Sequence, residues 1–561
     1  MELGFFSLLA YAGCAALAAL VLYGFHPVKR WRYRHLPGPP FRWLVGHLPE
    51  VFKEGQDDAQ ERWAEQYGSP FLMWMGALPV VVVSVPDQAR KVLARPARHV
   101  IYSLHTGEEG KLDSYSIVFT RSLELWKAAR GAWQPFFSAD SLAALAPTMK
   151  ASAARLAAHL QPAAAAGKPV DIWRELGLMT MDVVGTTAFG VDFNTLEHAA
   201  QQKEAEGAAE GSAERHVRTP ADRLIWAVRT IFELFALGNP MFALFFLFPE
   251  GEQAWKQLAN ALPTAGFRTE LKARGELRAI GTELIQQQLA AQGGGGETTA
   301  GDGKEGSNGG GTKGGGSVVH PAPHGRPAAI EPGSFLSLVL PSLGRQAGSE
   351  TLGPLWAVGQ ATTFIMAGYE TTANAIAYAV YLLAGNPDKE AKLLAEIDGW
   401  GRHKALPSAA DLPSALPYTA AVVQEALRMY PPAAVAVREV PCGISLGDKA
   451  IPGDAALQVC INAMQRSPRL WRDPKAFIPE RFMPGTPEAA EVTPGAYLPF
   501  GDGPRKCIGW RFALQEAALS LAALYQQYTF RLTPGQVPLK TKMVLTMGPV
   551  DGVHVTVHRR E

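Results

Sequence analysis

The chain has 561 residues, with 53 Lys and Arg against 52 Asp and Glu, and a formal net charge of +1. Hydrophobic residues make up 47% of it, which is enough for a large globular core and argues against a disordered or fibrous protein. The balanced charge gives no sign of a nucleic-acid partner, so binding to nucleic acid is not expected.

The first segment is predicted to be a membrane anchor. Residues 3–25 carry no charge, and about 20 apolar residues are enough to span a bilayer. Basic residues crowd positions 28–34, whereas only Glu2 precedes the apolar run, so the rest of the chain is placed in the cytosol. We therefore expect a transmembrane anchor over 1–28 and a catalytic domain over 29–561. A cleaved signal peptide is the alternative, but it usually has a basic start and a shorter apolar core.

The segments that follow predict a mainly α protein with a small β region. Prolines in residues 35–40 favour an extended connector, because proline cannot continue a helix. Residues 71–85 are rich in valine and are expected to form strands. Beyond Pro86 most segments have helical patterns, including 141–160 and 276–292.

Two apolar segments allow more than one interpretation. Residues 225–251 are unusually aromatic, and either pack in the core or form a pair of short helices partly immersed in the membrane. Residues 354–385 are long enough for a second span, but Glu370 and a glycine lie at the centre. A buried core helix is the better interpretation of this segment.

Two segments have the composition of insertions. Residues 293–332 are dominated by glycine and proline and are predicted to be a flexible surface insertion. An acidic, alanine-rich stretch at 198–220 is interpreted as a second one.

One cysteine stands in an unusual setting. The chain has only Cys14, Cys442, Cys460 and Cys507, without CxxC spacing, which excludes a disulfide scaffold and favours a reducing compartment. A lone cysteine is usually a small buried hydrophobe. However, PFGDGPRKCIGWRF surrounds Cys507 with turn-forming glycines, Arg505 and Phe500. If a helix opens at Ile508, its free N–H groups would favour a thiolate, as an axial ligand of heme iron requires. A phosphate-binding loop is a poor alternative, because GDGPRK lacks the Gly-Lys-Ser/Thr ending.

The order of motifs resembles that of the cytochrome P450 family over residues 35–561. FGDGPRKCIG (500–509) is similar to the family's heme-binding signature, and AGYETT (367–372) to its oxygen-binding groove. EALR (425–428), PERF (479–482) and WKAAR (126–130) resemble its ExxR, PERF and WxxxR elements. The resemblance implies a triangular helical prism with a small β region. Within the family, the chain looks most similar to a group of drug and steroid oxidases, thromboxane synthase and plant carlactone oxidases.

The resemblance also implies roles for individual residues. Cys507 would be the axial ligand of heme b (iron protoporphyrin IX), and Thr371 and Glu370 would deliver protons, with Thr371 bonding the carbonyl of Ala367. Glu425, Arg428 and Arg481 would form a buried structural triad. The other expected heme-binding residues are Arg505, Phe500, Gly503, Gly509, Trp126, Arg130, Arg438, Ala367 and Gly368.

The resulting hypothesis is a monooxygenase of the endoplasmic reticulum membrane. It would insert one atom of O2 into a lipophilic terpenoid, sterol or fatty-acid-like molecule. The chain has no dinucleotide-binding fingerprint, so electrons would come from NADPH-cytochrome P450 reductase, with cytochrome b5 as a further possible donor. Two alternatives remain: a heme-thiolate isomerase or dehydratase acting on a peroxide without reductase, and a non-catalytic heme sensor or carrier. Substrate contacts are expected mainly in variable loops such as 99–119.

Overall fold

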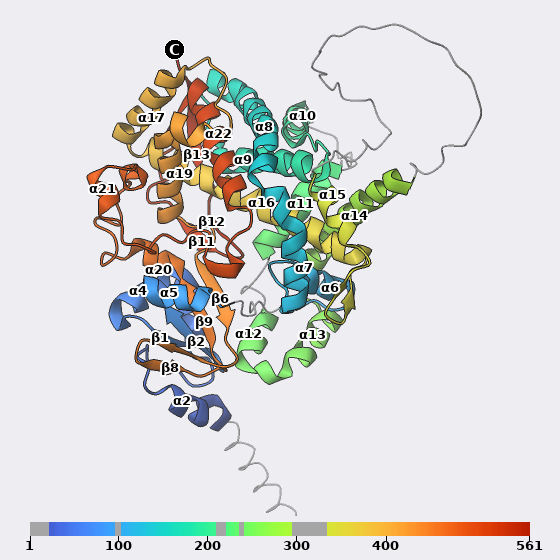
Figure 1. The fold of residues 1–561 in the computed structure, drawn as a ribbon, viewed down its shortest axis with the longest axis vertical. Coiled ribbons are helices and arrows are strands. Elements are labelled where there is room, and N and C mark those ends of the chain that lie inside the picture. Colours follow the sequence, from blue (N-terminus) through green and yellow to red (C-terminus); the bar gives the residue numbers. More distant parts are fainter. Residues whose placement is uncertain (1–21, 96–102, 209–219, 235–239, 294–333) are drawn as a thin grey trace, which may run out of the picture.

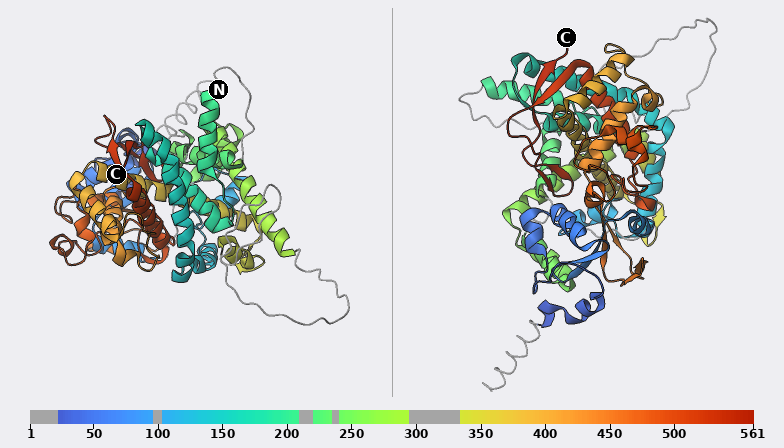
Figure 2. Two further views of the ribbon diagram at one scale, coloured as in Figure 1. Left: turned by 90° about the horizontal axis from the view of Figure 1, so that it is seen from above. Right: turned by 90° about the vertical axis from the view of Figure 1, so that its left-hand side faces the viewer.

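The structure is a computed structural model that describes residues 22–95, 103–208, 220–234, 240–293 and 334–561 (Figure 1). Its helical body has a small sheet region at one end, beside α2, and the C-terminus lies at the opposite end (Figure 2). This agrees with the predicted mainly α architecture. The helices are α2 Pro27–Tyr33, α3 Leu48–Glu54, α4 Gln56–Tyr67, α5 Pro86–Leu93, α6 Gly107–Tyr115, α7 Leu123–Trp133, α8 Ala139–Ala166, α9 Ile172–Val184, α10 Thr195–Ala208, α11 Pro220–Leu234, α12 Pro240–Leu247, α13 Glu252–Ala261, α14 Ala265–Gly293, α15 Phe335–Val339, α16 Pro354–Ala384, α17 Pro387–Trp400, α18 Leu412–Ala415, α19 Pro417–Met429, α20 Ile461–Arg466, α21 Pro487–Ala490 and α22 Trp510–Gln527.

The main sheet has the order β1-β2-β9-β6, with β2 and β9 parallel and the other pairs antiparallel. Its valine-rich strands are buried on both faces, which confirms the strand prediction for residues 71–85. A smaller sheet has the order β10-β13-β3, and three hairpins are formed by β4 and β5, β7 and β8, and β11 and β12. The strands are β1 Phe71–Met75, β2 Leu78–Val83, β3 Val170–Asp171, β4 Gln346–Ala347, β5 Glu350–Thr351, β6 Val435–Glu439, β7 Ile444–Leu446, β8 Lys449–Ile451, β9 Ala456–Cys460, β10 Tyr528–Leu532, β11 Thr541–Met543, β12 Met547–Pro549 and β13 His554–Arg559.

Helix α16 runs through the helical body and packs against α9, α14, α19 and α22. From Trp356 to Leu383 nearly every residue is buried, including polar ones. A helix that is apolar on all sides is stable in water only when other elements surround it. The interpretation of residues 354–385 as a core helix is therefore confirmed.

The predicted anchor lies largely outside the described residues, which begin at Leu22. In the described part of the chain, no helix combines the length and hydropathy that a membrane crossing requires. The proline-rich connector packs on the first strand, where the Leu72 N–H donates to the Pro37 carbonyl at 2.8 Å. The chain after the predicted anchor is thus tied to the sheet.

The aromatic segment 225–251 contributes to α11 and α12. Phe245 and Phe246 are buried, and the Phe246 carbonyl accepts a hydrogen bond from the Ala77 N–H at 2.7 Å. These contacts favour core packing for this part of α12. Contact of the segment with a membrane stays a prediction.

The two predicted insertions differ in outcome. Residues 294–333, nearly all of the segment 293–332, lie outside the described residues. The interpretation of 198–220 as a disordered insertion was wrong for its first part, because α10 extends to Ala208. Alanine and glutamate are strong helix formers, and this preference outweighs the polar composition.

Candidate active site

The loop before α22 holds Cys507 through its backbone. The Cys507 N–H donates to the Phe500 carbonyl at 2.9 Å. Gly503 has φ of +71°, and a Cβ there would lie 2.2 Å from the Leu93 carbonyl oxygen, so only glycine fits this approach to α5. Helix α22 begins at Trp510, not at Ile508 as expected, and Gly509 is its N-cap residue.

The surroundings of the Cys507 side chain oppose ionisation of its thiol. The side chain is exposed, yet enough protein surrounds the sulfur that burial raises the pKa of the thiol. A hydrogen bond from the Gly509 backbone and the charges of Arg130 and Lys506 oppose this rise in pKa. A backbone N–H after Cys507 thus favours the thiolate, as expected, but burial outweighs it. Coordination to a metal ion removes a thiol proton outright, so the thiolate form depends on that bond.

Most residues of helix α16 are buried, but three residues of the AGYETT motif are not. Between Trp356 and Leu383 only Ala367, Gly368 and Thr371 are not buried. Ala367 and Thr371 are four positions apart and lie on one side of the helix, whereas Gly368 is turned about 100° from Ala367. The Thr371 hydroxyl donates to the Ala367 carbonyl at 2.7 Å, as predicted.

Phe137 lies between the Cys507 loop and helix α16. A Cβ on Gly509 would lie 3.3 Å from the Phe137 ring, and that ring stacks on Phe364 with centroids 6.1 Å apart. Phe364 precedes Ala367 by three positions and shares its side of α16. The Cys507 loop and the exposed stretch of α16 therefore border one region.

Gly368 has a packing role in addition to the predicted contact with heme. A Cβ at this position would lie 2.5 Å from Cγ2 of Val184 in α9. The missing side chain thus permits the close packing of α16 against α9. Contact between the Gly368 backbone and a cofactor stays a prediction.

Glu370 points away from Thr371. Adjacent residues on a helix are about 100° apart, and the Glu370 Oε1 atom accepts a hydrogen bond from the Thr546 hydroxyl at 2.6 Å. Thr546 precedes β12, and Asn374, one turn after Glu370, donates to the carbonyl of Met547 at 3.1 Å. Glu370 and Thr371 therefore do not bond to each other, and their joint delivery of protons stays a prediction. Burial raises the pKa of Glu370 to about 7, while hydrogen bonds from Thr546 and Asn374 limit the rise.

This raised pKa predicts a pH-dependent contribution to stability. The native state binds the Glu370 proton more tightly than the unfolded chain, so the contribution is present at low pH and is lost as pH rises through about 7. The expected loss is about 3 kcal/mol between pH ~4.5 and neutrality. Glu370→Gln, which mimics the protonated acid, should flatten this slope when unfolding is measured against pH, whereas Glu197→Gln on the exposed side of α10 should not. An unchanged slope in Glu370→Gln would contradict the assignment.

The predicted arginines gather beside the cysteine loop, but with different partners. Arg130 Nη1 donates to the Lys506 carbonyl at 2.7 Å, directly before Cys507. The Arg505 guanidinium lies over the Trp126 ring, 4.8 Å from its centroid. Arg438 in β6 is buried and close enough to Arg505 that, after burial, repulsion between the two cations helps to lower its pKa to about 10. Burial lowers the pKa of Arg505 to about 10 as well.

These guanidinium groups fit the two carboxylates of a heme. In the described part of the chain, Arg438 Nε, Arg505 Nε and Arg505 Nη2 are buried without a hydrogen-bond partner. Buried charges are costly unless they are paired, and two neighbouring cations require an anionic partner. The propionates would supply that charge, and the accessible thiol of Cys507 would supply the iron ligand.

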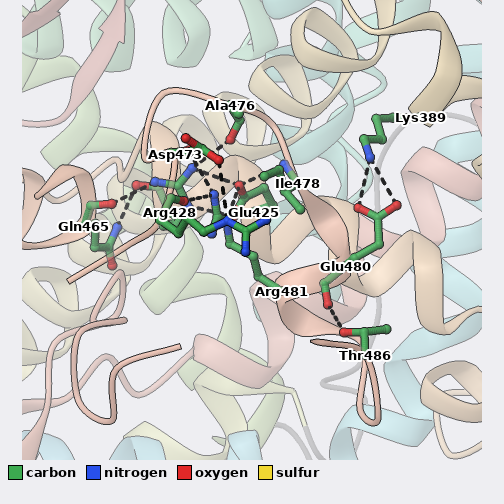
Figure 3. A network of polar contacts seen from close by, with 11 residues as sticks. Lys389, Glu425, Arg428, Gln465, Asp473, Ala476, Ile478, Glu480, Arg481 and Thr486 are labelled. Carbon is green, nitrogen blue, oxygen red and sulfur yellow. Dashed lines mark hydrogen bonds and ion pairs between the residues drawn. The ribbon is translucent and has the colours of Figure 1, made fainter. Parts of the chain in front are cut away.

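The structural triad is formed as predicted (Figure 3). Arg428 binds both Glu425 oxygens, with Nε–Oε2 at 2.7 Å and Nη2–Oε1 at 2.8 Å, and Arg481 Nε lies 3.4 Å from Oε1. All three are buried. Arg481 Nη2 also donates to the carbonyls of Arg472 and Asp473 at 2.6 and 2.9 Å.

Sequence reasoning missed two residues that connect these parts. Gln465 donates to the Arg428 carbonyl at 3.0 Å (Figure 3). It also accepts from the Leu498 N–H at 2.8 Å, which joins the triad to the segment just before the cysteine loop. Thr546 was missed as the partner of Glu370. Neither lies in a recognisable motif, and both partners are distant in sequence, so no local signal pointed to them.

Comparison with known proteins agrees with this site. Residues 36–262 and 330–554 match the family model described as cytochrome P450, and the unmatched part covers most of the glycine-rich segment. The chain is 30% identical to thromboxane-A synthase of Macaca fascicularis, over 97% of this chain and 96% of the relative. It is also 30% identical to thromboxane-A synthase of Sus scrofa, over 95% and 93%, and 26% identical to cytochrome P450 3A5 of Homo sapiens, over 97% and 95%. The chain belongs to the cytochrome P450 family and is a heme b protein.

Proposed function

We propose that this protein is a heme-thiolate monooxygenase that inserts one atom of O2 into a lipophilic small molecule. The observation that carries the proposal is the Thr371 hydroxyl, bonded to the Ala367 carbonyl on the exposed stretch of the otherwise buried helix α16. Reduction of O2 at a buried site consumes protons, and such a site needs an organised route for them. An alcohol at this position provides a donor where the surrounding helix is apolar.

Each residue of the site has a distinct task. When bound, the heme supplies the chemistry of oxygen activation, promoted by a sulfur ligand. Thr371 would hold a proton donor at the site. Glu370, with a pKa of about 7, would exchange protons near neutral pH after its carboxyl leaves Thr546. Arg438 and Arg505 would orient the cofactor through its propionates.

We also propose the predicted partners and location. Lys506 and Arg511 flank Trp510, with their charged groups 4.3 and 4.8 Å from its ring centroids, on the side of Cys507. This basic face suits an acidic electron donor such as NADPH-cytochrome P450 reductase, or cytochrome b5. The uncharged residues 3–25 would anchor the chain in the lipid of the endoplasmic reticulum membrane, with the catalytic domain in the cytosol.

Substrate screening would test the proposed reaction. Purified full-length protein would be titrated with terpenoids, sterols and fatty acids, and binding followed by the spin-state change in heme absorbance. Ligands that bind would be incubated with reductase and NADPH, and products searched for one added oxygen atom. A product that requires both NADPH and O2 is expected.

The second candidate is a heme-thiolate isomerase or dehydratase. It is favoured by the relatives named thromboxane-A synthase, whose names describe synthases and not oxygenases. Such an enzyme would convert an organic peroxide without NADPH. Turnover of a peroxide at full rate in the absence of reductase would therefore overturn the monooxygenase proposal.

Replacement of Thr371 should uncouple electron use from product formation. Thr371→Ala removes the hydroxyl but leaves the cysteine loop intact, so heme and substrate binding should persist. The ratio of product to NADPH should fall at least about tenfold, with hydrogen peroxide released instead. Thr371→Ser keeps the hydroxyl and serves as the control, and should retain most of the coupling. A fully coupled Thr371→Ala enzyme would remove the proposed role of this residue.

A further inference from the structure

A group of four buried ionisable residues joins α6 to α14. His105 lies directly before α6, Asp113 lies within α6, and Glu270 and Arg274 lie one turn apart on α14. The four residues are between 6% and 9% exposed, so solvent screens their charges little. We refer to these four residues as the His105 cluster.

The contacts of the cluster place both ring nitrogens of His105 against carboxylates. His105 Nδ1 lies 2.8 Å from Asp113 Oδ2, and Nε2 lies 3.4 Å from Glu270 Oε1. Neutral imidazole has one N–H and therefore presents a lone pair to one of the two acids. Only the protonated ring presents an N–H to each acid; the contact of Nε2 with Glu270 is an ion-pair contact that lacks hydrogen-bond geometry. The His105 ring also stacks on Phe267, with centroids 5.6 Å apart, which restricts its rotation.

The net charge of the His105 cluster also favours protonation of His105. Arg274 approaches both acids, with Nη1 3.0 Å from Asp113 Oδ1 and Nε 3.1 Å from Glu270 Oε1. Two carboxylates and one guanidinium leave a net negative charge, which protonation of His105 neutralises. A buried uncompensated charge is strongly destabilising, so the neutral cluster is the more stable one.

The surroundings hold further charged groups on both helices. On α6, Glu109 Oε1 lies 3.1 Å from Arg278 Nε of α14, and Arg278 also contacts Glu108. Ser103 Oγ donates to Asp113 Oδ2 at 2.6 Å. From α13, Asn260 Nδ2 donates to the Leu104 carbonyl at 2.9 Å, so this helix adds a polar but uncharged contact.

The carboxylates of Asp113 and Glu270 favour the protonated form of His105. Burial, the largest single effect, and Arg274 both lower the pKa of His105, but the contacts with Asp113 and Glu270 outweigh them and hold it above its ordinary value. A raised histidine pKa means that the stabilisation is fully present below the ordinary pKa, near 6.5, and is lost as pH rises through the higher value.

The segment held by this cluster lies between α14 and the helix that carries the site. On the side of α16, the Tyr115 carbonyl accepts a hydrogen bond from Gln360 Nε2 at 2.7 Å, two turns before Ala367. At the end of the segment, Arg121 pairs with Glu439 at 3.0 Å, next to Arg438 in β6. Residues 103–121 thus connect α14 with two elements that border the Cys507 region. They overlap the loop 99–119, in which substrate contacts were predicted.

We propose that protonated His105 is a positioning residue that clamps residues 103–116 against α14, and that loss of its proton loosens this segment and speeds the passage of small ligands to the site. The proposal rests on the heme pocket but not on the proposed oxygenation reaction. A protein that binds heme without oxygenating any substrate would still show this behaviour.

Carbon monoxide is a suitable probe because it needs neither reductase nor substrate. We would measure its association with the dithionite-reduced, full-length heme protein by flash photolysis between about pH 6 and pH 8.5. The expected rate rises at least about threefold across this range. His105→Gln, which keeps a similar shape but cannot be protonated, should be fast at both ends. His403→Gln, an exposed position after α17, should retain the profile of the natural protein.

Hydrogen exchange provides a second measurement on the natural protein, so the proposal does not depend on a variant that folds. Peptides within residues 103–116 should lose protection as pH rises, after correction for the intrinsic pH effect with peptides from the buried helix α19. Unchanged protection, an unchanged carbon monoxide rate, or a His105→Gln protein with the natural pH profile would each overturn the proposal.

Discussion

Replacing Cys507 by serine is expected to abolish the thiolate-type red-shifted band in the ferrous carbon monoxide spectrum. The sulfur lies at the accessible end of a loop that is fixed by the Phe500 carbonyl and by the close approach of Gly503 to α5. An alcohol is far less acidic than a thiol, so serine cannot provide the same anionic ligand. Activity should fall by more than the roughly 10–100-fold that loss of an outer-shell partner typically costs.

Cys442→Ser provides a matched control for this experiment. Cys442 is an exposed free thiol before β7, and Cys460 is buried at the end of β9. The Cys442 variant should keep the natural spectrum. A red-shifted band that persists in Cys507→Ser would show that another residue binds the iron, and would remove the basis of the proposed chemistry.

Replacing Glu425 by glutamine should destabilise the protein by about 3–5 kcal/mol. The carboxylate is fully buried and binds Arg428 through two short contacts, Arg481 through one, and the Ile478 N–H at 3.0 Å. Its removal leaves two buried guanidinium groups without a counter-charge. Gln465 joins the same network to Leu498, so heme retention should also decline. Chemical unfolding of the heme-bound protein, with heme absorbance recorded in parallel, measures both effects.

Glu480→Gln is the control for this second prediction. Glu480 directly precedes Arg481, but it pairs with Lys389 and Lys392 near the surface. Glu480 is only 13% exposed, but Lys392 is 54% exposed, so solvent partly screens these pairs. The loss should therefore be smaller than for the fully buried Glu425. Equal destabilisation by the two substitutions would show that Glu425 is not a special buried partner.

The parts of the site that were predictable depend on residues close in sequence. The i, i+3 spacing of Glu425 and Arg428 places them on one helix face, and the i, i+4 spacing brings the Thr371 hydroxyl to the Ala367 carbonyl. The glycine pattern around Cys507 likewise indicated a tight loop. The contacts that sequence did not reveal concern distant neighbours. Val184, from another helix, determines why residue 368 is glycine.

The orientation of the Glu370 side chain likewise depends on a residue that is distant in sequence. Its position next to Thr371 suggested a pair, but a single helical step separates the two side chains by about 100°. A hairpin 176 residues further along the chain provides its partner, Thr546. The His105 cluster was not predicted either, because its halves lie on α6 and α14 and neither half forms a motif.

By itself, the sequence determined the family, the small β region, the buried central helix and the members of the triad, and it singled out Cys507 as the proposed iron ligand. These features depend on composition, periodicity and residue spacing, which act within one helix, strand or loop. Only the tertiary structure decided which groups are unpaired, which carboxylates are protonated near neutral pH, and what holds residues 103–116 in place. Burial and charge pairing set those properties, and both depend on segments that the fold brings together from distant parts of the chain.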